Sequence, residues 1–143
     1  MTDLERLIAI EDIRSLMARR VRCLDEKDWE GFGACYAEDA IASFNGKPDG
    51  SKGRQQVIDN TVGILETWTT VHQVHSYEID FQSDDEATGI WALYDYLNWD
   101  NEDGETQFLR GYGHYRQSYR KIDGQWLITQ HELTRLLVET GEL

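Results

Sequence analysis

The sequence predicts an α+β fold, in which N-terminal helices cover one face of a curved antiparallel sheet. Two observations support this prediction. The first half of the chain shows the helical spacing of apolar residues, and the second half is rich in β-branched and aromatic residues separated by short turns. Helices followed by a run of strands are typical of α+β proteins. The length of 143 residues fits one domain spanning residues 1–143.

The first expected helix begins after Thr2 or Asp3, either of which can serve as its N-cap. Apolar residues then recur at helical spacing over 4–24, and we expect the helix to end near Asp25.

Two further helices and a strand are expected before the sheet proper. Asp28 is a natural N-cap for a shorter helix over 29–36, and a short strand is expected over 40–44. The composition of 45–53 predicts a loop, and a third helix is expected over 54–68.

Four long strands complete the predicted fold. The Asp123-Gly124 pair between the last two is a strong signal for a two-residue hairpin turn. Strands of this length are expected to bend, and a bent sheet covered by helices encloses a cavity. The four predicted strands span residues 69–81, 87–99, 107–122 and 125–138.

Charge excludes several classes of partner. The chain carries 27 acidic and 14 basic residues, for a net charge of −13, so its surface repels phosphate backbones and anionic membranes. We therefore expect neither nucleic acid nor a membrane as a partner. The N-terminus lacks the basic and apolar regions of a signal peptide, which predicts a cytoplasmic protein.

The histidines do not predict a metal site. His72 and His75 are three residues apart on a predicted strand, so their side chains point to opposite faces. The chain also lacks a glycine-rich phosphate-binding pattern, so we expect neither a metal nor an organic cofactor.

Several stretches resemble the SnoaL-like branch of the nuclear transport factor 2-like superfamily. They are LDEKDW (24–29), CYAEDA (35–40), GRQQVI (53–58), GYGHY (111–115) and YRKIDGQWLI (119–128). The resemblance covers nearly the whole chain and is closest to a lyase group containing scytalone dehydratase, hexachlorocyclohexane dehydrochlorinase and bile acid 7α-dehydratase. It implies a cone-shaped α+β barrel, also described as cystatin-like.

The same resemblance implies site residues. The lyase group places an aspartate at the end of the first helix and a histidine early in the strand after the third helix, and Asp25 and His72 stand at these places. Two of its families also have a pocket arginine on the last strand, where His131 is expected instead. His131 would then hold a substrate oxygen or receive a leaving group, and the alternative is an ordinary hydrogen-bonded strand residue.

An Asp–His pair is a general base with its orienting group, because the carboxylate fixes the tautomer and stabilises the imidazolium. The alternative for this chain is that Asp25 caps the second helix and His72 is an ordinary strand residue. Asp95, on an otherwise apolar strand face, is a second candidate, since isomerases and cyclases of this fold use strand carboxylates. The alternative for Asp95 is an edge or interface residue with a partner such as Arg110.

These residues predict a cofactor-independent lyase or isomerase that acts on a small, partly apolar ring compound. Asp95, Trp68 and Tyr112 are expected to contact the substrate. The alternatives are a non-catalytic ligand-binding or dimerisation module and a polyketide-cyclase-like enzyme that uses Asp95. The many aromatic side chains of the strands cannot all line one pocket, so we expect some to pack against a second subunit in a homodimer or homotrimer.

Overall fold

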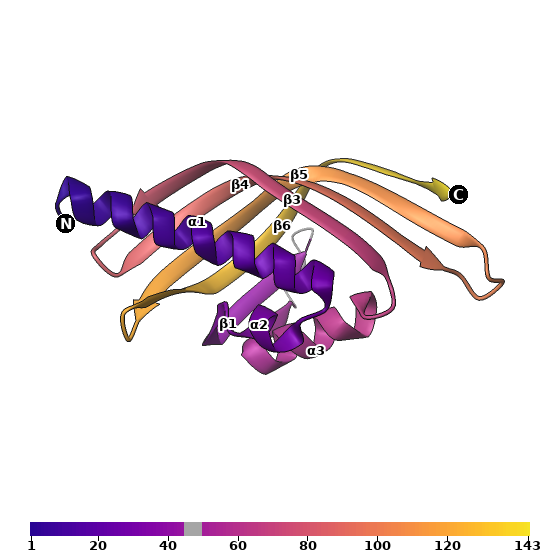
Figure 1. Ribbon diagram of the computed structural model, residues 1–143, viewed down its shortest axis with the longest axis horizontal. Coiled ribbons are helices and arrows are strands. Elements are labelled where there is room, and N and C mark those ends of the chain that lie inside the picture. Colours follow the sequence, from indigo (N-terminus) through magenta and orange to yellow (C-terminus); the bar gives the residue numbers. More distant parts are fainter. Residues whose placement is uncertain (45–49) are drawn as a thin grey trace.

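A computed structural model describes residues 1–44 and 50–143 (Figure 1). A long helix, α1 (Asp3–Glu26), runs along a curved sheet, and two shorter helices, α2 (Trp29–Gly33) and α3 (Arg54–Leu65), gather at one end. Within the described ranges, no helix is both long and apolar enough to cross a membrane.

The helix starts follow from the sequence. Thr2 caps α1 in a reciprocal capping box, in which its hydroxyl accepts from the Glu5 amide at 3.1 Å and the Glu5 carboxylate accepts from the Thr2 amide at 2.7 Å. Asp28 caps α2 by accepting from the amide of Gly31 at 2.9 Å. The alternative in which Asp25 caps the second helix is therefore wrong.

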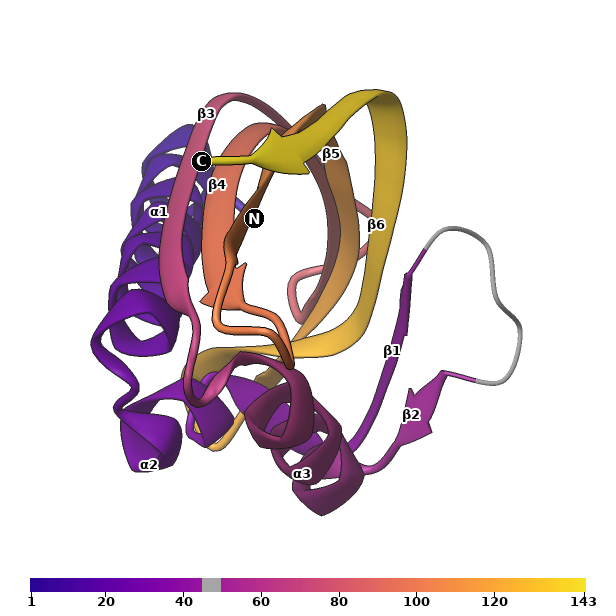
Figure 2. The same cartoon turned by 90° about the vertical axis from the view of Figure 1, so that its right-hand side faces the viewer.

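Over the described residues, the sheet has six strands in the order β2-β1-β6-β5-β4-β3 and does not close. In chain order these are β1 (Tyr36–Phe44), β2 (Ser51–Lys52), β3 (Thr69–Phe81), β4 (Glu86–Asp100), β5 (Thr106–Ile122) and β6 (Gln125–Glu142). The last four form the predicted antiparallel meander, and Figure 2 shows them curling beside α1 and above α3. The predicted α+β fold with a curved sheet is confirmed.

The structure differs from the prediction at the first strand. β1 begins at Tyr36 rather than residue 40, and it runs parallel to β6, a pairing that the local sequence does not reveal. Ser51 and Lys52, expected in a loop, pair with β1 as β2. The remainder of that predicted loop, 45–49, lies outside the described residues.

The core forms between α1 and the concave face of the sheet. Apolar side chains of α1, such as Ile13, Leu16 and Met17, are fully buried and pack with Trp91 and Tyr115 from the strands. The two faces of β4 alternate strictly, with odd-numbered residues from Trp91 to Leu97 buried and even-numbered ones partly exposed. This alternation decides which strand residues can reach a site beneath α1.

Candidate active site

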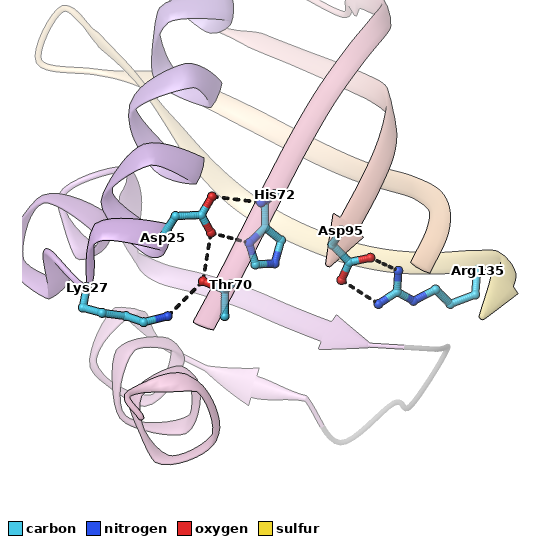
Figure 3. A network of polar contacts seen from close by, with 6 residues as sticks. All are labelled: Asp25, Lys27, Thr70, His72, Asp95 and Arg135. Carbon is cyan, nitrogen blue, oxygen red and sulfur yellow. Dashed lines mark hydrogen bonds and ion pairs between the residues drawn. The ribbon is translucent and has the colours of Figure 1, made fainter. Parts of the chain in front are cut away.

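Asp25 and His72 meet where the end of α1 crosses the start of β3. The ring Nδ1 of His72 lies 2.7 Å from Asp25 Oδ1, and the backbone amide of His72 donates to Asp25 Oδ2 at 2.8 Å (Figure 3). The His72 side chain is 6% exposed. The contact expected between these two residues is therefore confirmed, and its catalytic role stays a prediction.

A second layer of polar groups holds the Asp25 carboxylate. Thr70 donates its hydroxyl to Asp25 Oδ1 at 2.9 Å, and Lys27 donates to the Thr70 oxygen at 2.9 Å (Figure 3). Burial lowers the pKa of Lys27, while the nearby Asp25 carboxylate opposes this shift. The carboxylate thus accepts three hydrogen bonds, which fix its orientation.

The position of Asp25 sets the chemistry of the His72 ring. A carboxylate only accepts hydrogen bonds, so the neutral ring carries its proton on Nδ1 and its lone pair on Nε2. His72 stands between Asp25 and Asp95, which is its direct partner across the β3–β4 pair (Figure 3). Nε2 is therefore the atom that can accept a proton from a substrate.

His72 borders a partly enclosed cavity of about 180 Å³ between α1, α3 and the sheet. Asp95 and Trp68, both expected to contact a substrate, line it, and Trp68 stacks on Trp99 with ring centroids 4.2 Å apart. Its walls are mainly apolar, including Leu24, Phe32, Val57, Ile64, Leu97 and Leu133. An apolar hollow with a few convergent polar groups is typical of a small-molecule site.

His72 also borders an open groove of about 480 Å³ between α1 and β3, which Glu11, Arg14 and Gln73 help to line. We place the candidate site in the smaller cavity, because the other buried charged groups near His72 line that cavity.

Asp95 forms a bidentate ion pair with Arg135 of β6, with N–O distances of 2.5 and 2.9 Å (Figure 3). The expected partner, Arg110, instead has its Nη2 3.7 Å from Glu139 Oε2, so the pairing of Asp95 with Arg110 is wrong. Gly111 makes room for the ion pair, because an added Cβ would overlap both Arg135 Nη1 and Asp95 Oδ1. Arg135 is therefore the last-strand arginine that lines the cavity.

The expectation that His131 takes the place of that arginine is wrong. His131 is 2% exposed, and it is held between Arg20, whose Nη2 lies 3.2 Å from Nε2, and Gln117, whose amide nitrogen lies 2.8 Å from Nδ1. His131, Leu133 and Arg135 share the inner face of β6 by alternation, so residue parity could not decide which of them reaches the cavity. His131 instead supports Arg20.

His131 is expected to make stability depend on pH. Burial, followed by electrostatic repulsion from Arg20 and His72, lowers the pKa of His131 well below its ordinary value of 6.5. As the pH falls below 6.5, His131 therefore takes up a proton in the unfolded chain but not in the folded chain. This difference favours unfolding, so stability is lost as the pH falls. Between pH 7.5 and 5.5, the free energy of unfolding should therefore fall by about 1.4 kcal/mol less in His131→Gln than in the unaltered protein.

Urea unfolding at a series of pH values measures this difference. His75→Gln is the matched control, because His75 is exposed and its replacement should leave the pH dependence unchanged. Parallel curves for the unaltered protein and His131→Gln would show that His131 titrates normally in the folded state.

Arg20 and Arg135 are the cavity-lining charges that sequence reasoning missed. Arg20 falls at helical spacing within the buried face of α1, between Met17 and Leu24, and a charge on an apolar face is a usable signal. The sequence signal for Arg135 was weaker: it lies two residues after Leu133, and therefore on the same face of the strand as that apolar residue.

Tyr112 does not line the cavity, contrary to expectation. Its Cα partner on β4 is Tyr94, and the two rings pack 5.2 Å apart on the opposite face of the sheet from Asp95. Tyr112 is 38% exposed there. The physical reason is strand alternation, since an even-numbered β5 residue in this stretch faces outward.

His75 faces away from the cavity, as the alternation predicts. It pairs with Ala92 and is exposed, and its ring Nδ1 lies 3.1 Å from the Ser76 hydroxyl. In the part of the chain that the structure describes, no group of three or more His, Cys, Asp or Glu side chains is arranged to hold a metal ion.

Solved structures share this architecture. A provisionally assigned scytalone dehydratase from Novosphingobium aromaticivorans is 26% identical, with a TM-score of 0.85 over 97% of this chain and 91% of that one. A hexachlorocyclohexane dehydrochlorinase from Novosphingobium barchaimii is 19% identical, with a TM-score of 0.80 over 99% and 94% of the two chains. A protein of unknown function from Mycobacterium tuberculosis is 26% identical, with a TM-score of 0.77 over 94% and 76%.

The sequence also matches a family model along most of its length. The model describes a SnoaL-like domain and covers residues 5–132, which include most of α1, all of α2 and α3, and the Asp25–His72 pair. The chain therefore belongs to the SnoaL-like domain family.

Proposed function

We propose that the protein is a cofactor-independent lyase that eliminates water from a small ring compound, with His72 as general base. The observation that carries this proposal is the 2.7 Å Asp25–His72 contact at the wall of a cavity that also contains the Asp95–Arg135 pair. A base of fixed tautomer beside a cationic group is what abstraction of a proton next to a carbonyl requires.

The reaction would use the described groups in sequence. His72 Nε2 takes a proton from the carbon next to a carbonyl, and Asp25 stabilises the imidazolium that forms. The carbonyl oxygen gains negative charge, which the guanidinium of Arg135 can stabilise. The β carbon then loses its hydroxyl group, and the imidazolium gives its proton to that departing group. The products are a conjugated alkene and water.

The cavity restricts the substrate to about one ring. Its volume is about 180 Å³, and an engineered cavity of about 150 Å³ is sufficient to hold benzene. The similarity to a provisionally assigned dehydratase at 26% identity supports elimination of water over other leaving groups.

The cyclase-like alternative, with Asp95 as base, is less well supported. Both nitrogens of the Arg135 fork bind the Asp95 carboxylate, so each of its oxygens is already engaged in an ion pair rather than free to face a substrate. The non-catalytic alternative is retained as an outcome of the test.

Two assays with single-ring probes test the proposal. Conversion of 3-hydroxycyclohexanone to cyclohexenone, followed by ultraviolet absorbance with a chelator and no added cofactor, reports elimination. Exchange of the α-hydrogens of cyclohexanone in D₂O, followed by NMR, reports the base alone. We expect both reactions to exceed the buffer rate. A protein that binds cyclohexanone yet catalyses neither reaction would be a binding module.

A further inference from the structure

Arg20 is a buried cation that has no anionic partner among the described residues. The residue is 3% exposed and lines the cavity. Its Nε donates to the Tyr36 hydroxyl at 2.8 Å, and its Nη2 lies 3.2 Å from His131 Nε2. Among the described residues, Nη1 has no hydrogen-bond partner.

The groups around Arg20 are neutral. Its guanidinium carbon lies 4.8 Å from the Tyr115 ring centroid and 5.5 Å from that of Phe32, which are cation–π distances. No carboxylate of residues 1–44 or 50–143 forms an ion pair with it. A guanidinium does not lose its proton, so the charge remains and its burial is costly without a counter-charge.

The other charges near the cavity are balanced. Asp95 is paired with Arg135, and the Asp25 carboxylate is linked through Thr70 to the ammonium group of Lys27 (Figure 3). Counting residues 1–44 and 50–143, Arg20 therefore leaves the cavity with one excess positive charge. An apolar cavity with one unmatched cation fits an anion better than a neutral molecule.

We propose that the cavity binds a small ring compound carrying a carboxylate or a similar anionic group, and that Arg20 supplies the counter-charge. Describing this anion as the substrate rests on the proposed function, whereas its binding does not. The cavity of about 180 Å³ accommodates one ring with one such group.

Calorimetric titration with benzoate and benzamide tests the proposal, because these probes share a ring and differ in charge. We expect the unaltered protein to bind benzoate about 10- to 100-fold more tightly, the range of a charge-assisted hydrogen bond. Arg20→Met should abolish this preference, and Arg20→Lys, which keeps the charge, should retain most of it.

Arg22→Met is the matched control on the same helix, since Arg22 is exposed and paired with Glu26. This variant should prefer benzoate over benzamide as strongly as the unaltered protein does. Equal binding of the two probes by the unaltered protein, or a preference that survives in folded Arg20→Met, would overturn the proposal. The comparison is repeated in His72→Ala. A preference kept there supports the anion site even if His72 proves not to be a catalytic base.

Discussion

Replacement of His72 by alanine is expected to lower turnover at least about a hundredfold, because general-base catalysis contributes about 10²–10⁴-fold. The variant loses the ring whose Nδ1 is oriented by Asp25 at the cavity wall. The apolar walls that supply affinity remain, so benzamide should bind within about a factor of three of the unaltered protein, as is usual when a group acts only in the transition state. Rates of enone formation and calorimetric titration measure the two effects separately.

His75→Ala is the matched control for this prediction. His75 is on the same strand but faces outward opposite Ala92, so its removal should leave the rate unchanged. Similar losses in both variants would point to a general effect on β3 and would contradict a specific role for His72.

Asp25→Asn is expected to cause the second largest loss of activity, about 10²-fold or more. An amide has one accepting oxygen, whereas the Asp25 carboxylate accepts from the His72 amide, the His72 ring and the Thr70 hydroxyl. An asparagine NH₂ group facing Nδ1 would move the ring proton to Nε2 and remove the lone pair that accepts the substrate proton. The amide also lacks the charge that stabilises the imidazolium.

The same change should lower the free energy of unfolding by about 1–3 kcal/mol, because a buried donor loses its partner. Asp28→Asn, three residues away, is the control, since asparagine caps a helix about as well as aspartate. Its rate and stability should match those of the unaltered protein. Steady-state kinetics and urea unfolding of both variants test this prediction, and unchanged kcat in Asp25→Asn would rule out the dyad mechanism.

Local sequence patterns were sufficient for most secondary structure. The capping residues Thr2 and Asp28 and the Asp123-Gly124 turn act within a few residues of themselves, so their effect is readable from the chain alone. Both turn residues have the positive φ angles, 51° and 80°, that such a hairpin favours. The outward orientation of His75 followed from alternation in the same way.

Partners distant in the sequence were beyond such patterns. Asp25 and His72 were paired only through resemblance to a family, and nothing local indicated that Asp95 would choose Arg135 over Arg110. The register shifts between Tyr112 and Gly113 and between Ser118 and Tyr119 change which residues of β5 and β6 oppose one another. The burial of the His131 side chain depends on this register.

The sequence by itself determined the helices, the four long strands and the alternation of side chains between the two faces of each strand, because these depend on spacing within one segment. Only the tertiary structure decided that Arg20 would be buried beside the cavity without an ion-pair partner among the described residues, and that Arg135 rather than His131 would line it. The physical reason is that the electrostatic environment of a buried charge depends on which segments meet around it, and that is set by sheet curvature and register.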